Sequence, residues 1–220
     1  ATSEITHATP AAFVAHVDLR WKTDEISSQM VDSNVATFLG GGRHFFLPEE
    51  MGGKREDGRN LLQEVSDSHV LLKTKEDMIN FDLKTPGRIF GLFADEHIRN
   101  IETPDNHAFE PSLTDMLQFS VNRSDYFIDN GCTGFFIMAE GSQVDWAGHV
   151  NNIDYLNNEM KDLDSAVEWA LNYAMVNDDT LVVVTADHET GGLLIEPANP
   201  VDYSGDKVKF SFNTAVGRGT

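Results

Sequence analysis

The chain has 220 residues, of which 40% are hydrophobic and 10% aromatic, enough to bury one substantial core. Its formal net charge of −20 argues against nucleic acid as a partner, because phosphate backbones are bound through Lys and Arg. The single cysteine, Cys132, excludes an internal disulfide, and no apolar run approaches the roughly 20 residues of a membrane helix. We therefore expect one domain over residues 1–220, with two small domains as the weaker alternative, and we expect it to bind neither nucleic acid nor a membrane.

The first half of the chain predicts short strands that alternate with helices. A helix is expected in "THATPAAFVAHVDLR", where Thr9 can cap, Pro10 fits the first helical position and residues 11–17 continue the helix. Strands are expected in "NVATFL", "HVLLKT" and "RIFGLFAD", which turn residues bound. Three glycines at 40–42 predict a tight turn after the first strand. The stretch "PSLTDMLQFSVNRS" predicts a helix that begins near Pro111.

The second half of the chain predicts a strand, a long helix and another strand. The strands are expected at residues 135–139 and in "LVVVTA" at 181–186. Between them, apolar residues recur at three- and four-residue spacing from Leu156 to Ala174, which predicts a helix of about six turns. Both predicted strands are apolar without alternation, as in parallel sheets that are buried on both faces. We expect an α/β fold with a mostly parallel central sheet flanked by helices.

Two clusters of polar residues follow the two predicted strands of the second half. Glu140, Asp145 and His149 follow the first, and Asp187 with His188 follows the second. Because open α/β sheets bind ligands beyond the carboxyl ends of their strands, we expect these side chains to converge. Asp145 and His149 are four residues apart and would share one face of a helix. Carboxylate with imidazole suits zinc, and a carboxylate with hydroxyl oxygens suits magnesium.

The adjacent pair Asp187 and His188 could be a turn rather than a site. Within a strand the two side chains would point to opposite faces, so they reach one ion only where the strand has ended. Gly191 and Gly192 allow the backbone to turn there. An isolated Asp-His pair after a strand is more often a turn, and it is the second cluster that favours metal binding.

Three stretches of the chain resemble motifs of the alkaline phosphatase family. They are "THATPAAFVAHVDLR", "MAEGSQVDWAGH" and "TADHETGG", and they occur in the order that the family has. The resemblance extends over the whole chain and implies an α/β fold. It also implies hydrolysis of phosphate monoesters by two zinc ions and one magnesium ion, through a covalent phosphoserine. Export to the periplasm or the cell exterior is implied as well, and the homodimer common in the family is left open.

The resemblance also implies roles for individual residues. It assigns six metal ligands, which are Asp145 and His149 for one zinc, Asp187 and His188 for the other, and Thr9 and Glu140 for magnesium. His7 matches a position that flanks the magnesium site. Arg20 matches the arginine that binds the substrate phosphate, for which its planar guanidinium is suited. Trp146 lies beside a zinc aspartate and, together with His7, is similar to marine and cold-adapted bacterial members.

The chain departs from the family pattern at two places. The family's nucleophilic serine lies upstream of the first motif, and a third histidine ligand of one zinc is expected after Thr220. The pair Asp32-Ser33 mimics the nucleophile, but it follows the Arg20 motif, so Ser33 is interpreted as a polar turn or helix residue. We therefore expect an internal fragment that has no turnover alone and a weakened affinity for zinc.

The remaining candidate residues receive structural roles at this point. Five histidines have no ligand spacing and are interpreted as structural: His16, His44, His69, His97 and His107. Cys132 is interpreted as a small core residue. Two alternative functions stay open. One is another hydrolase or transferase of the same superfamily, such as a sulfatase, a phosphonate-ester hydrolase or a phosphomutase. The other is a non-catalytic, metal-poor scaffold domain.

Overall fold

The computed structural model describes residues 1–101, 103, 106–197 and 208–211. The chain divides into two compact units, Ala1–Gly141 and Ser142–Thr220, which we call unit 1 and unit 2 and describe separately. The expectation of a single domain over the whole chain stays a prediction. None of the helices described here combines the length and the apolar character that crossing a membrane requires.

Unit 1 is built on a parallel three-stranded sheet. Its strands are β1 (Thr37–Gly40), β2 (His69–Leu72) and β3 (Arg88–Leu92), in the order β1-β3-β2. Phe38 of β1 and Leu71 of β2 are both paired with Phe90 of the central strand. The strands lie in the three runs that the sequence analysis selected, and the parallel sheet confirms the expected α/β fold class.

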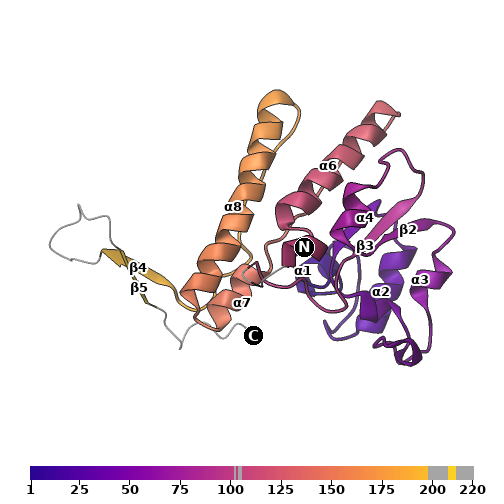
Figure 1. The fold of residues 1–220 in the computed structure, drawn as a ribbon, viewed down its shortest axis with the longest axis horizontal. Helices are drawn as coiled ribbons and strands as arrows, with labels where there is room; N and C mark the ends of the chain where they lie inside the picture. Colours follow the sequence, from indigo (N-terminus) through magenta and orange to yellow (C-terminus); the bar gives the residue numbers. More distant parts are fainter. Residues whose placement is uncertain (102, 104–105, 198–207, 212–220) are drawn as a thin grey trace. The chain divides into compact units, whose positions relative to one another are not determined.

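Helices cover both sides of this sheet. Figure 1 shows α2 and α3 on one side of the strands and α4 and α6 on the other. The helices and 3-10 turns of unit 1 are α1 (Ala8–Ala12), α2 (Thr23–Asp32), η1 (Arg43–Phe46), η2 (Glu49–Met51), α3 (Leu61–Glu64), α4 (Lys75–Ile79), α5 (Asn106–Phe109) and α6 (Leu113–Asp129). The main core joins α2 and α3 to the sheet through Ile26, Met30, Leu61, Phe38 and Phe90. The rings of Phe38 and Phe90 stack with centroids 5.0 Å apart.

Side-chain caps mark the beginning of α3, α4 and α6. The helix predicted near Pro111 begins after Ser112, whose hydroxyl accepts the Asp115 N–H while the Asp115 carboxylate accepts the Ser112 N–H. This reciprocal pair satisfies two backbone donors that a helix start otherwise leaves unpaired. The prediction for α1 was wrong in detail. Thr9 does not cap it, because the cap position is His7, and the helix ends at Ala12 rather than Val17.

The glycine triplet at 40–42 packs three segments of unit 1 tightly together. A Cβ atom on Gly41 would lie 2.0 Å from the Glu96 carbonyl oxygen, and one on Gly42 would lie 3.0 Å from the Glu4 Cβ atom. Gly42 also has a φ of 91°, which L-residues with side chains rarely adopt. The expected tight turn is confirmed, and its purpose is to let the N-terminal segment and residues 94–97 contact the end of β1.

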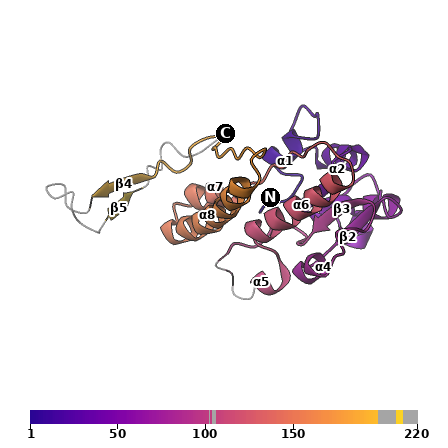
Figure 2. The same cartoon turned by 90° about the horizontal axis from the view of Figure 1, so that it is seen from above.

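Unit 2 consists of two helices and a two-stranded antiparallel sheet. The helices are α7 (Gln143–His149) and α8 (Ile153–Val176), and the strands are β4 (Leu194–Pro197) and β5 (Val208–Ser211). Figure 2 shows α7 and α8 side by side. The Asn152 side chain caps α8 by accepting the N–H groups of Asp154 and Tyr155. The long helix predicted from the apolar spacing is thus confirmed.

Three predictions about local structure were wrong. Neither residues 135–139 nor residues 181–186 form a strand, and their apolar side chains are largely exposed, with Phe136 at 78% and Leu181 at 85%. An apolar sequence favours a strand, but a strand also needs a hydrogen-bonded neighbour, and neither segment pairs with another strand in the part of the chain described. Cys132 is exposed rather than in the core, because it follows the end of α6 in a surface turn.

Candidate active site

The residues predicted to bind zinc form two pairs in unit 2. Asp145 and His149 lie one turn apart on α7, with Oδ2 of the aspartate 3.3 Å from Nε2 of the histidine. The expected placement on one helix face is confirmed. Asp187 and His188 form the second pair, in which Oδ2 lies 3.4 Å from Nε2. Each pair therefore presents one carboxylate and one imidazole together.

Thr190 connects the two pairs. Its hydroxyl lies 2.5 Å from Oδ1 of Asp145, to which it donates, and 3.1 Å from Nδ1 of His188. The next residue, Gly191, has a φ of 85° and lies against α7, where a Cβ atom would come within 2.6 Å of the Gly148 carbonyl oxygen. Two motifs that are some forty residues apart in the sequence are thus in contact within unit 2. Thr190 lies within the motif "TADHETGG", and no role was predicted for it.

The chemistry of these pairs suits zinc. A carboxylate oxygen and an imidazole nitrogen are both zinc ligands, and all four side chains are at least one-third exposed, so an ion can reach them. Within the described ranges, however, no three His, Cys, Asp or Glu side chains gather closely enough to hold a metal ion as they stand. The assignment of these four residues to zinc stays a prediction, as does the convergence with Glu140.

Arg20 is the residue of unit 1 that the sequence analysis assigned to phosphate. Its Nη2 lies 3.2 Å from Nε2 of His7, and its guanidinium lies 5.0 Å from the ring centroid of Trp21. A guanidinium can only donate, so Nε2 of His7 is the acceptor. Among the arginines that the structure describes, only Arg20 has neither a carboxylate nor a carbonyl partner; the others are Arg43, Arg55, Arg59, Arg88, Arg99 and Arg123.

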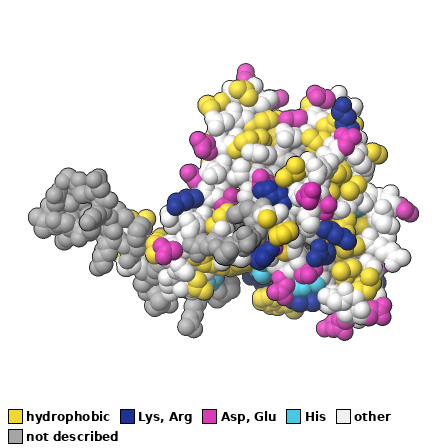
Figure 3. Space-filling view, viewed as in Figure 1, with side chains coloured by type: hydrophobic (Ala, Val, Ile, Leu, Met, Phe, Trp, Pro, Cys, Tyr) yellow, Lys and Arg dark blue, Asp and Glu magenta, His cyan; other side chains and the backbone are white. Residues whose placement is uncertain are grey.

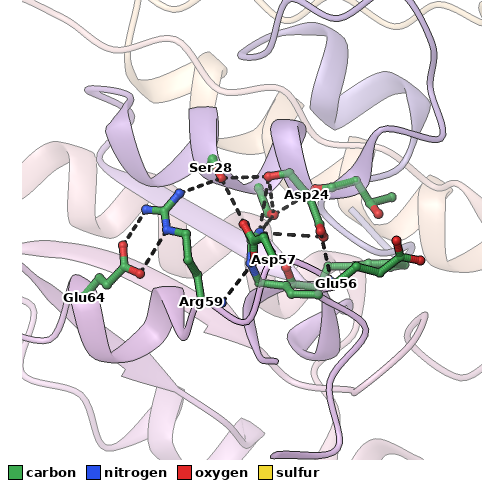
Figure 4. A network of polar contacts seen from close by, with 10 residues as sticks. Asp24, Ser28, Glu56, Asp57, Arg59 and Glu64 are labelled. Atoms are coloured by element: carbon green, nitrogen blue, oxygen red, sulfur yellow. Dashed lines mark hydrogen bonds and ion pairs between the residues drawn. The ribbon is translucent and has the colours of Figure 1, made fainter. Parts of the chain in front are cut away.

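Arg59 differs from Arg20 because its guanidinium is paired with a carboxylate. Figure 4 shows Arg59 directed at Glu64, with Nη2 and Oε2 2.5 Å apart, and in contact with Ser28. On the face drawn in Figure 3, Lys and Arg side chains are likewise interspersed with Asp and Glu. In a chain with 36 acidic residues and 16 basic ones, an exposed arginine without an acidic partner is available to bind an external anion.

The remaining predicted residues are Thr9, Glu140 and Trp146, together with Ser33, which was rejected as the nucleophile. Thr9 is the second residue of α1, and the backbone carbonyl of Glu140 accepts the Thr2 N–H at 3.2 Å. Trp146 lies on α7 directly after Asp145. The assignment of Thr9 and Glu140 to magnesium stays a prediction. Ser33, interpreted as a polar turn or helix residue, ends α2, where its hydroxyl donates to the Met30 carbonyl at 2.8 Å.

Comparison with known proteins decides the family. Residues 1–210 match the family model described as alkaline phosphatase. The chain belongs to the alkaline phosphatase family. It is 34% identical over 201 residues to alkaline phosphatase 4 of Bacillus subtilis, a match that covers 89% of this chain and 40% of that protein. The resemblance inferred from the three motifs is therefore confirmed.

Solved structures agree with this assignment. The alkaline phosphatase of the Antarctic bacterium TAB5 superposes with a TM-score of 0.77 at 34% identity, covering 97% of this chain and 59% of that one. A variant of the TAB5 enzyme with one histidine replaced by aspartate, which has Mg bound in its M3 site, gives a TM-score of 0.78 at 32% identity with the same coverage. The chain thus spans about half the length of the relatives that it matches.

One group of residues was missed from the sequence. His44 and His97, both interpreted as structural, lie near the largely buried Glu4, with their Nε2 atoms 3.9 Å and 3.7 Å from its Oε1 atom. Burial raises the pKa of Glu4 to about 7 and lowers the pKa of His97 to about 4. The signal that could have found them is their position, because each histidine follows the carboxyl end of a predicted strand.

Proposed function

We propose that the protein that carries this chain hydrolyses phosphate monoesters, and that Arg20 binds the phosphate. The family match supports the reaction class, since it covers residues 1–210. The observation that carries the role of Arg20 is that it has no acidic partner among the described residues of a strongly acidic protein. Held by His7 on one side and Trp21 on the other, the guanidinium keeps donors available for two oxygens of a phosphate.

We further propose that Asp145, His149, Asp187 and His188 supply zinc ligands. Bound zinc supplies a Lewis acid that withdraws charge from phosphoryl oxygens. The contribution of this chain is the placement of the ligands, because Thr190 ties Asp145 to His188 through its hydroxyl. A carboxylate and an imidazole held in this way lose little freedom when they bind an ion. Thr9 and Glu140 are proposed for magnesium.

The wider biological setting is proposed from the family alone. The family match and its bacterial relatives lead us to propose a periplasmic or extracellular location and a phosphate monoester as the small-molecule substrate. A homodimer belongs to the same proposal. These three points are independent of the geometry around Arg20, and each would be tested by its own measurement.

The role of Arg20 is tested by hydrolysis of p-nitrophenyl phosphate in the protein that carries this chain, supplied with zinc and magnesium. Loss of a charge-assisted hydrogen-bonding group is worth about 1.5–3 kcal/mol, so Arg20→Ala is expected to lower kcat/KM by roughly 10- to 100-fold. Arg59→Ala is the matched control, because it removes an exposed arginine that is already paired with Glu64. Equal rates for Arg20→Ala and Arg59→Ala would contradict the proposal, as would a preference for p-nitrophenyl sulfate.

A further inference from the structure

The carboxyl ends of β1 and β3 bring three separate segments of unit 1 together. After β1 the chain continues through Gly41 and Gly42 to His44, and after β3 it continues to His97. The N-terminal segment joins them through backbone hydrogen bonds, of which Ile5 N–H to the Gly41 carbonyl is one. The Gly42 N–H donates to the Glu96 carbonyl at 2.7 Å, which fixes the segment that carries His97. The three segments therefore hold Glu4, His44 and His97 in place.

Glu4 contacts both nitrogen atoms of the His97 ring. The Glu4 backbone N–H donates to Nδ1 of His97 at 3.1 Å, while its carboxylate Oε1 lies 3.7 Å from Nε2. Because Nδ1 accepts a hydrogen bond, the proton of neutral His97 is on Nε2, where it faces the carboxylate. The Glu4 side chain is only 12% exposed, so water competes little for this contact. One residue thus fixes both the tautomer and the orientation of the ring.

His97 in turn contacts the residue that holds Arg20. The rings of His97 and His7 meet edge to face at 87°, with centroids 5.5 Å apart. On its other side His7 accepts the hydrogen bond from Arg20 Nη2 at 3.2 Å. A continuous set of contacts therefore runs from the buried Glu4 through two imidazole rings to the exposed guanidinium. If the His97 ring moved, His7 would lose one of the neighbours that limit its rotation.

A metal site at Glu4 is the competing interpretation of this cluster. Two imidazole groups and a carboxylate are a familiar ligand set for divalent metals. The tautomer argues against it, because Nε2 of His97 carries a proton and has no lone pair to give to a metal. In the same way, Nδ1 is already occupied by the Glu4 N–H. The contacts favour a hydrogen-bonded support over a ligand set.

We propose that His97, whose Nδ1 accepts the Glu4 N–H and whose Nε2 lies 3.7 Å from the Glu4 carboxylate, is a positioning residue that orients His7 and thereby Arg20 for phosphate binding. This proposal rests on the proposed function of Arg20 and adds residues that neither contact phosphate nor belong to the three motifs. Misplacing one charge-assisted hydrogen bond weakens phosphate binding by about tenfold without abolishing it. The effect is expected in the inhibition constant of inorganic phosphate more than in kcat.

The first test measures the inhibition constant of inorganic phosphate and kcat separately in the protein that carries this chain. His97→Phe keeps an aromatic ring but removes both nitrogens, and Glu4→Gln removes the carboxylate charge. We expect both to raise the inhibition constant about tenfold. His69→Phe is the matched control, because it makes the same replacement at a ring that packs on Phe90, and a change of less than about twofold is expected there. An unchanged constant in His97→Phe overturns the proposal.

Two further measurements separate positioning from general damage to the fold. In the Arg20→Ala background, His97→Phe should have almost no additional effect on the phosphate constant, and a full additional effect would overturn the proposal. Nitrogen-15 NMR of the chain itself reports the His97 tautomer without any activity. A proton on Nε2 supports the proposal and a proton on Nδ1 overturns it. A protein that hydrolyses no phosphate monoester refutes the proposed function, whereas a phosphatase indifferent to His97 refutes only the positioning role.

Discussion

The buried Arg55 of unit 1 and the two exposed Asp–His pairs of unit 2 have opposite surroundings. Arg55 is 1% exposed, and its guanidinium donates hydrogen bonds to Asp57, Ser27 and the Phe45 carbonyl. In unit 2 the paired side chains Asp145–His149 and Asp187–His188 are at least one-third exposed. A buried polar group affects stability because its desolvation must be offset by partners, while an exposed pair is free to bind a ligand.

The largest predicted effect is the loss of stability when Arg55 is replaced, which tests whether burial makes a polar group important for the fold. Arg55→Ala leaves the Asp57 carboxylate and the Ser27 hydroxyl without their main partner, so we expect unfolding to become easier by about 3–5 kcal/mol. Arg59→Ala, at a side chain that is 45% exposed, is expected to cost less than about 1 kcal/mol. Urea denaturation followed by circular dichroism measures both, and similar costs would show that burial does not set the difference.

The next effect is on the pH dependence of stability and concerns Glu4. Burial raises its pKa from 4.5 to about 7, partly offset by the charge of Lys54 and reinforced by Glu96. A carboxyl whose pKa is higher in the folded state stabilises the fold below pH 4.5 and loses that contribution as the pH rises through about 7. The stability of the wild type relative to Glu4→Gln should therefore fall by up to about 3 kcal/mol between pH 5 and pH 8.

The contribution of His97 to stability changes with pH in the opposite direction to that of Glu4, so the measurement must separate the two. Its pKa is lowered to about 4 by burial and by His7, so its contribution is present above pH 6.5 and is lost as the pH falls toward 4. Comparing Glu4→Gln with the wild type at each pH largely cancels this term. Glu64→Gln is the control, since its carboxylate is exposed, is paired with Arg59 and is not among the charges that shift the pKa of Glu4. A pH-independent difference between the wild type and Glu4→Gln would contradict the raised pKa.

The same contrast explains what the sequence could predict. Local signals were sufficient where neighbours in sequence decide the structure: the capping box at Ser112, the apolar spacing of α8 and the Asp145–His149 pair one turn apart on α7. The family motifs supplied Arg20 and the zinc assignments. These predictions needed no knowledge of which distant segments meet.

The failures are those where distant segments decide the structure. Residues 181–186 have the composition of a buried strand, but a strand forms only with a partner, and the sequence does not show which partner is present. His44 and His97 were taken as structural because their sequence spacing fits no ligand pattern. They meet at Glu4 only because β1 and β3 are parallel neighbours, whose carboxyl ends lie at the same edge of the sheet.

The smallest effect concerns Thr190 and tests the exposed side of the comparison. Thr190→Val removes the hydroxyl that contacts Asp145 and His188, so we expect zinc affinity of the chain to fall by about 10- to 100-fold, as for other groups that orient metal ligands. The stability of the apo chain should change by less than about 1 kcal/mol, because the contacts are partly exposed. Thr185→Val is the matched control, since that hydroxyl donates to the adjacent Ala186 carbonyl and has no other hydrogen-bond partner among the described residues. Calorimetric titration with zinc measures the affinities.

Equal affinities in the two variants would mean that the hydroxyl does not orient the ligands, and a chain that binds no zinc would remove the four side chains from the proposed site. An effect on affinity without one on stability is the reverse of what we expect for Arg55, and finding both would show that Thr190 holds its polar partners for a ligand and Arg55 holds its partners for the fold.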